Sequence, residues 1–238
     1  MHEYGTTREQ LAQVAAKNKT HAANNAFAHF QKEVSVDDVY DSFELSPPLC
    51  LYDCSGVTDG AAGLILMSEE KAREVTDEAA WITGSGQTCL GSNSINNLPS
   101  MSAWPQATQA AEQAYEQAGI DDPVAELDVA EVHDCFSISE IVEYEDLGWV
   151  EKGEGGKFIE EGRSELDGDI AVNPRGGLLG CGHPLGATGV SQALEVFNQF
   201  RGTVEPERQV PDPETGLIHN LSGSASVHSV MTLARGRL

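Results

Sequence analysis

Six glycines fall within the fourteen residues 176–189, which read Gly-Gly-Leu-Leu-Gly-Cys-Gly-His-Pro-Leu-Gly-Ala-Thr-Gly. This density predicts a loop, because glycine has no Cβ and weakens the interior of a helix or strand. Such a loop lets the backbone approach a ligand closely. His183 lies in it, shortly before a predicted helix whose free N–H groups would stabilise negative charge. A structural turn with an incidental histidine is the alternative, and the surrounding glycines favour a functional loop.

The remaining sequence alternates between helical and extended patterns. Thr7 with Gln10 has the spacing of a capping box, and a second capped start lies at Ser35. This alternation predicts a layered α/β fold. We expect helices over 7–19, 107–118, 137–147 and 188–200, and strands at 61–67, 81–82, 127–132, 170–172, 217–221 and 227–233.

The charge of the chain excludes some partners. Asp and Glu number 38 against 14 Lys and Arg, for a net charge of −24. Such a protein repels phosphate backbones, so we expect no nucleic-acid partner. The acidic residues are dispersed, which is typical of proteins from salt-accumulating cells, where a Debye length of about 3 Å near 1 M salt mutes self-repulsion. An ordinary acidic protein is the less favoured interpretation.

Hydropathy and cysteine usage predict a cytoplasmic protein. No apolar stretch is long enough to cross a bilayer, and the first residues lack an apolar signal region, so no membrane association is expected. The five cysteines form no CxxC pair, which argues against a metal site and for reduced thiols. They are Cys50, Cys54, Cys89, Cys135 and Cys181.

Two further segments could take part in chemistry. His133-Asp134-Cys135-Phe136 lies at a predicted strand-to-helix junction, where a cysteine is expected to have a lowered pKa and to act as acid, base or nucleophile. A buried core thiol explains Cys135 equally well. The segment 53–62, Asp-Cys-Ser-Gly-Val-Thr-Asp-Gly-Ala-Ala, leads into the predicted strand 61–67, and a turn alone would explain it.

Taken in order, these three segments resemble the thiolase family. The sequence GHPLGATG at 182–189 is similar to the family's glycine-histidine block, and 53–62 resembles the block before the last strand of its N-terminal domain. HDCF at 133–136 resembles the sterol-carrier-protein-type and archaeal branches, and 220–225 falls where the family has its final glycine-rich loop. The resemblance implies the layered αβαβα thiolase fold. Residues 1–48 would be loop-domain helices, 49–75 the end of the N-terminal domain and 76–238 the C-terminal domain.

The resemblance also implies an activity. Thiolases are acyltransferases that interconvert two acyl-CoA molecules with 3-ketoacyl-CoA and CoA, by Claisen condensation or thiolysis, with coenzyme A thioesters as substrates and no permanently bound cofactor. By resemblance, His183 would activate the nucleophile and help hold the thioester oxygen, and His133 would hold a water in the same oxyanion site. Cys135 would be the acid/base, with Cys181 a less favoured substitute.

Resemblance further assigns residues that would contact the substrate. Ser55 matches a serine that contacts the pantetheine arm, and backbone N–H groups from Gly223 to Ala225 would supply part of a second oxyanion hole. Short acyl chains are implied, with acetoacetyl-CoA as a first substrate and isoprenoid-precursor synthesis as one context. The implied partners are further copies of the chain and, for archaeal relatives, an OB-fold protein.

One departure from the family pattern concerns the nucleophile. The family's nucleophilic cysteine lies in an N-terminal segment resembling Cys-Ala-Ser-Gly, and none of the five cysteines here has that context. Three hypotheses follow: a fragment of an active thiolase, one half of a split enzyme completed by an N-terminal chain, or a non-catalytic acyl-CoA-binding or scaffold subunit. In this chain by itself, the predicted strand 61–67 would lack its neighbours and expose an apolar edge.

Overall fold

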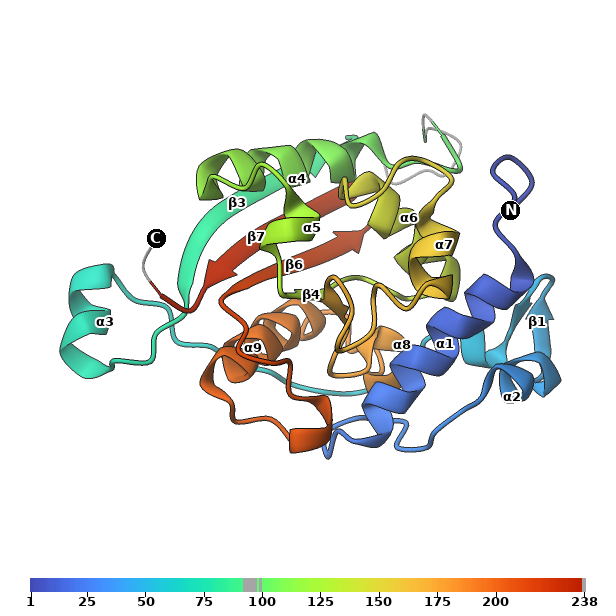
Figure 1. Ribbon diagram of the computed structural model, residues 1–238, viewed down its shortest axis with the longest axis horizontal. Helices are drawn as coiled ribbons and strands as arrows, with labels where there is room; N and C mark the ends of the chain where they lie inside the picture. The colour runs from blue at the N-terminus through green and yellow to red at the C-terminus, as the bar shows by residue number, and fades with distance from the viewer. Residues whose placement is uncertain (92–97, 99, 237–238) are drawn as a thin grey trace.

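A five-stranded mixed sheet organises the fold (Figure 1). The computed structural model describes residues 1–91, 98 and 100–236. The strand order is β3-β7-β6-β4-β5, in which β4 is parallel to both its neighbours and β7 is antiparallel to β6 and β3. The strands are β3 (Trp81–Cys89), β4 (Val129–Glu131), β5 (Ala171–Val172), β6 (Thr215–Ser222) and β7 (Val227–Ala234).

Helices cover both faces of this sheet. Helix α4 (Pro105–Ala118) packs on β3 and β7, and helix α9 (Thr188–Arg201) packs on β6 and β4. Side chains alternate between the two faces along each strand. Leu217 of β6 is therefore buried with α4 and its neighbours, whereas the next residue, Ile218, is buried against Val196 and Phe200 of α9. Figure 1 shows α4 and α9 on opposite sides of the sheet.

The approach of α4 to the sheet depends on glycines in β3. A Cβ added to Gly86 would lie 1.9 Å from the carbonyl oxygen of Ala110, and one added to Gly84 would lie 2.0 Å from that of Ala114. Any side chain at these positions would push the helix away. The helix ends at Gly119, whose left-handed φ of 71° suits glycine.

Helix α1 (Arg8–Ala23) is largely buried. It begins at Thr7 with a complete capping box to Gln10, as predicted. It packs against α6, α7 and α8 (Figure 1). The other helices, hairpin strands and 3-10 turns are α2 (Val36–Asp41), β1 (Glu44–Ser46), β2 (Leu49–Cys50), η1 (Leu51–Asp53), α3 (Glu69–Val75), α5 (Pro123–Glu126), α6 (Ser137–Asp146), α7 (Gly155–Glu160), α8 (Gly177–Cys181) and η3 (Pro206–Arg208).

Most predicted elements are confirmed, but two predictions are wrong. Residues 61–67 form no strand, and Ile65 and Leu66 are 85% and 76% exposed. An apolar run becomes a buried strand only beside a partner strand, and none lies beside it among the described residues. The second error concerns 176–189, of which Gly177–Cys181 is the helix α8 and not loop.

The glycines of α8 serve helix packing. A Cβ added to Gly180 would lie 2.3 Å from the Cβ of Ala22, so glycine lets α8 lie directly on α1. The division of the chain at residues 48 and 75 stays a prediction. Among the residues that the structure describes, no helix is both long and apolar enough to cross a bilayer.

Candidate functional site

Two histidines from distant segments meet at the end of the central strands. His133 follows β4, and His183 follows α8 in the connection to α9. Their rings contact edge to face, with centroids 4.8 Å apart and planes at 86°. The structure therefore brings together the two histidines that the sequence singled out.

The hydrogen bonds of His183 determine which ring nitrogen carries its proton. Its Nδ1 lies 2.8 Å from the Thr188 hydroxyl, and that hydroxyl donates its proton to the Pro184 carbonyl at 3.1 Å. Thr188 can therefore only accept from His183, which places the proton on Nδ1 and leaves a lone pair on Nε2. Burial, and secondarily the charge of Arg175, lowers the pKa of His183 and keeps the ring neutral.

His133 has the opposite arrangement. The backbone N–H of Leu221 donates to its Nδ1 at 3.4 Å, so the ring proton lies on Nε2. Burial lowers the pKa of His133 to about 3, and repulsion by His183 and His228 contributes to the shift. Near neutral pH the pair thus consists of one imidazole with a free Nε2 lone pair and one that is an N–H donor at Nε2.

Cys135 lies two residues from His133, just before α6. Its carbonyl oxygen accepts a hydrogen bond from the backbone N–H of Ser55 at 3.0 Å, and its Sγ lies 3.8 Å from the Ser139 hydroxyl. The pKa of the thiol was predicted to be lowered by the helix N-terminus. That prediction is wrong, because burial raises the pKa of Cys135 to about 12 and outweighs the hydrogen bond from Ser139.

Asp134 ties the two histidine-bearing segments to each other. Its carboxylate accepts hydrogen bonds from the backbone N–H groups of Leu178 at 2.6 Å and Leu179 at 3.2 Å, and from the Asn18 side chain at 2.7 Å. A side chain at Gly177 would overlap this carboxylate, since its Cβ would lie 2.2 Å from an Asp134 oxygen. The spacing between His133 and His183 is therefore set by a buried connection.

The predicted substrate-contacting residues lie around the same centre. Ser55 is held beside Cys135 by their backbone hydrogen bond. Gly223, Ser224 and Ala225 form the turn between β6 and β7, with left-handed φ values of 61°, 56° and 59°. β6, which leads into this turn, carries the Leu221 N–H that bonds to His133. Their roles in binding stay predictions.

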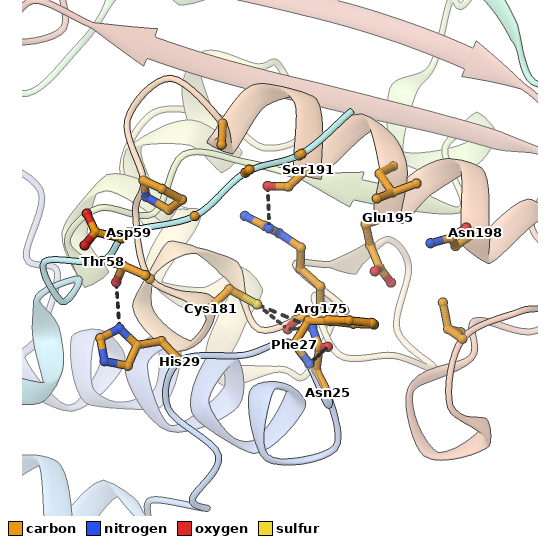
Figure 2. A pocket seen from close by; sticks show the side chains of 18 of the residues that line it. Asn25, Phe27, His29, Thr58, Asp59, Arg175, Cys181, Ser191, Glu195 and Asn198 are labelled. Carbon is orange, nitrogen blue, oxygen red and sulfur yellow. Dashed lines mark hydrogen bonds between the residues drawn. The ribbon is translucent and has the colours of Figure 1, made fainter. Parts of the chain in front are cut away.

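Cys181 lines a hollow beside Arg175 and Asn25 (Figure 2). Its thiol donates to the Arg175 carbonyl at 2.9 Å and receives a hydrogen bond from Asn25 at 3.4 Å. Burial raises the pKa of Cys181 to about 12. Because its proton is held by a backbone carbonyl, Cys181 is a poorer acid/base candidate than Cys135.

The hollow itself has a volume of about 750 Å³ and borders the glycine-histidine block through Gly182, Pro184 and Ala187. Figure 2 shows Arg175 directed at Ser191, 2.7 Å away. The cations there are already paired, Arg175 with Glu131 at 2.7 Å and Arg208 with Glu195 at 2.5 Å. With Asp59 and Glu205 also in its lining, this hollow offers little attraction for an anionic ligand.

Sequence reasoning missed several residues that position the pair. Thr188 fixes the His183 tautomer and belongs to the glycine-histidine block, so its spacing could have identified it. Asn220 hydrogen-bonds to His133 and is itself held by Gln192 at 2.8 Å, which only the tertiary fold reveals. Within the described part of the chain, no three metal-ligating side chains cluster as an ion would require.

Comparison with known proteins identifies the family. The sequence model described as "Thiolase C-terminal domain-like" matches residues 88–235. The chain belongs to the thiolase family. Acetyl-CoA acetyltransferase of Methanothermobacter thermautotrophicus is 44% identical, over 99% of this chain and 60% of that protein. Sterol carrier protein 2 of Bos taurus is 36% identical, over 98% of this chain and 43% of that protein. The chain thus spans 60% or less of these two relatives.

Solved structures confirm the thiolase-like fold. The structure titled "Ltp2-ChsH2(DUF35) aldolase" superposes with a TM-score of 0.86 at 27% identity, over all of this chain and 61% of that one. The Bacillus anthracis acetyl-CoA acetyltransferase superposes with a TM-score of 0.69 at 19% identity, over 98% of this thiolase-family chain. The predicted family and fold class are both confirmed.

Proposed function

We propose that this thiolase-family chain supplies the acid/base and oxyanion residues of an acyl-CoA acyltransferase that forms or cleaves 3-ketoacyl-CoA. The edge-to-face pair of His133 and His183, with protons on opposite ring nitrogens, carries this proposal. A lone pair at His183 Nε2 can accept a thiol proton, while the N–H at His133 Nε2 can orient a water towards a developing oxyanion.

In thiolysis, the nucleophilic cysteine would come from a segment or chain beyond these 238 residues, since none of the five cysteines has the expected context. His183 takes its proton, and the thiolate attacks the 3-keto carbon. The bond between that carbon and the α-carbon then breaks, leaving an acyl-enzyme and the enolate of acetyl-CoA. The Cys135 thiol gives its proton to the enolate carbon. Free CoA then gives its thiol proton to the Cys135 thiolate and takes the acyl group as acyl-CoA, and His183 returns its proton to the released nucleophilic cysteine.

The protonation state of Cys135 agrees with this assignment. Burial raises its pKa to about 12, so near neutral pH it is a thiol that can donate a proton. In the condensation direction the thiolate would be a scarce but strong base. Ser55 would contact the pantetheine arm, and the backbone of 223–225 would hold the second oxyanion.

Two alternatives share this fold. A non-catalytic acyl-CoA-binding subunit would use the site without proton transfer. The second alternative is a carbon–carbon lyase, which the likeness to the structure titled "Ltp2-ChsH2(DUF35) aldolase" supports. A lyase would cleave a 3-hydroxyacyl-CoA without free CoA and without an acyl-enzyme. A protein of the DUF35 kind, an N-terminal thiolase half or a second copy of the chain are the partners that we propose.

One half-reaction tests the proposal without the missing nucleophile. We expect the chain to exchange the methyl protons of acetyl-CoA for deuterium from D₂O, as read by mass spectrometry. Replacing Cys135 by Ala should slow this exchange by about 100-fold or more, the usual contribution of a general acid/base. Cys89→Ala is the matched control, because Cys89 is an exposed cysteine at the end of β3.

The outcomes separate the alternatives. Binding of acetyl-CoA without Cys135-dependent exchange would favour the non-catalytic subunit. Cleavage of a 3-hydroxyacyl-CoA in the absence of free CoA would favour the lyase. If the chain neither binds acetyl-CoA nor exchanges its methyl protons, the proposal for these 238 residues is contradicted.

A further inference from the structure

A line of buried polar groups connects helix α6 to the turn that carries Gly223 and Ala225. Glu143 Oε1 lies 3.3 Å from His219 Nδ1, and His219 Nε2 lies 3.0 Å from His228 Nδ1. His228 Nε2 then lies 2.9 Å from the carbonyl oxygen of Ala225. Glu143, His219 and His228 are fully buried. The mechanism proposed above uses none of these three side chains.

The directions of the two hydrogen bonds, His219 to His228 and His228 to Ala225, follow from the last member of the line. A carbonyl oxygen only accepts, so His228 must carry its proton on Nε2. Burial lowers the pKa of His228, so its Nδ1 is a lone pair that needs a donor, and His219 supplies one from Nε2. His219 is also neutral, because burial lowers its pKa well below the usual value. Its Nδ1 is therefore a second lone pair, and it faces Glu143.

Only a protonated carboxyl group can complete the line. An ionised Glu143 would set its lone pairs against that of His219, whereas a carboxylic acid donates to it. Burial raises the pKa of Glu143 well above its usual value, and the nearby carboxylates of Asp134, Glu140 and Asp146 raise it further. A backbone hydrogen bond from His133 opposes this shift without reversing it.

Other groups around the two rings agree with neutral histidines. His133 repels a proton on His219, and Trp104 packs on the His228 ring with centroids 5.6 Å apart. The hydrogen bond to the Ala225 carbonyl and the charge of Asp146 both favour a charged His228, but burial outweighs them and lowers its pKa. Asp146 is itself paired with Lys152 at 2.7 Å.

The backbone of the turn at the end of this line needs a hydrogen bond to hold its conformation. Ser224 and Ala225 have φ values of 56° and 59°, in the left-handed region that a residue with a Cβ seldom adopts. The Ala225 carbonyl belongs to the backbone whose N–H groups are the proposed oxyanion donors. Fixing the carbonyl therefore fixes the direction of the adjacent peptide groups.

We propose that Glu143, His219 and His228 are positioning residues that form a relay of hydrogen bonds in one direction. The Glu143 carboxyl group donates to His219, His219 donates to His228, and His228 donates to the Ala225 carbonyl. The last of these bonds holds the turn 223–225 in place. The value of this relay to catalysis rests on the proposed function. The hydrogen bonds of the relay do not depend on the proposed function, so an experiment can contradict the relay or the function without contradicting the other.

The first test uses the unaltered chain and needs no substrate. In ¹⁵N NMR of the imidazoles, we expect His219 and His228 to be Nε2–H tautomers with unprotonated Nδ1 between pH 7 and 8. A titration of either ring in this range, or protonation of His219 at Nδ1, would overturn the relay. His29, an exposed histidine bonded to Thr58 at 2.7 Å, is the internal reference.

The second test compares two variants of Glu143. Glu143→Gln keeps a donor for His219, and we expect amide hydrogen exchange at 223–226 to stay within about threefold of the unaltered chain. Glu143→Leu fills the space but removes the donor, and exchange there should rise about tenfold, as expected for losing one buried hydrogen bond.

The amides of β3 serve as the control for global unfolding, and they should be unchanged in Glu143→Gln. If Gln and Leu loosen the turn equally, or if neither does, the relay is wrong. Deuterium exchange into acetyl-CoA reports on the proposed function independently of this result.

Discussion

The rings of His133 and His183 meet edge to face, 4.8 Å between centroids, although they follow different elements of the fold. Each ring is neutral, because burial lowers the pKa of both histidines. Repulsion by His183 and His228 lowers the pKa of His133 further, and the charge of Arg175 does the same for His183. One ring therefore has a lone pair at Nε2 and the other carries an N–H at Nε2. The arrangement depends on the connection from Asp134 to α8 as much as on the histidines themselves.

Acid stability should depend on His133. Its pKa is about 3 in the folded chain against about 6.5 when unfolded, so below pH 6.5 the unfolded chain takes up a proton that the folded chain refuses. This stability is lost as the pH falls from 6.5 towards 3. Urea unfolding at pH 7 and pH 5 should show that the unaltered chain loses roughly 2 kcal/mol more than His133→Asn. Equal losses would contradict a buried neutral His133.

The glycines of the glycine-histidine segment should differ in their tolerance of a methyl group. Gly180→Ala places a Cβ 2.3 Å from Ala22 and should destabilise the chain by about 1–3 kcal/mol through overpacking. Gly186→Ala is the matched control, because a Cβ there meets nothing within 4 Å. Its free energy of unfolding should change by less than about 1 kcal/mol. Equal effects would mean that α8 does not lie directly on α1.

Two lysine pairs should contribute unequally to stability. Lys17 and Glu140 form an ion pair at 2.6 Å with both side chains buried, so Lys17→Met leaves a buried carboxylate without its cation and should cost about 3–5 kcal/mol. Lys71 pairs with Glu74 at 2.6 Å on the surface, where both are more than half exposed. Lys71→Met should change the free energy of unfolding by less than about 1 kcal/mol. Comparable losses would contradict the burial of the first pair.

Salt should stabilise the folded chain. A net charge of −24 repels itself in the compact state, and raising KCl from 0.1 to 1 M shortens the Debye length from about 10 to about 3 Å. Thermal unfolding midpoints should therefore rise with KCl concentration, and equally with NaCl. A falling or constant midpoint would contradict the interpretation of the acidic composition as an adaptation to salt.

Local sequence signals predicted the secondary structure well. The capping boxes at Thr7 and Ser35 and the terminal Gly119 act within a few residues of themselves, so they can be identified without the tertiary fold. The run 61–67 shows the limit of such signals. Its composition indicates burial, but burial requires a neighbouring surface that composition does not encode.

The sequence likewise predicted some features of the site, whereas others depend on the tertiary fold. His133, Cys135 and His183 lie in segments that the sequence singled out and that the resemblance to the thiolase family assigned to the site. The pKa of Cys135 does not follow from its place before a helix, because burial by distant residues outweighs the local effect. The line from Glu143 through His219 to His228 joins α6, β6 and β7, and only the folded chain brings these residues together.

The most direct test of the proposed half-site is the pH profile of deuterium exchange into acetyl-CoA. The part of the rate that Cys135→Ala removes should rise about tenfold per pH unit from pH 7 to 9, because the thiolate fraction grows tenfold per unit below a pKa of about 12. A rate that persists in Cys135→Ala, or one that levels off below pH 8, would contradict the role assigned to this buried thiol.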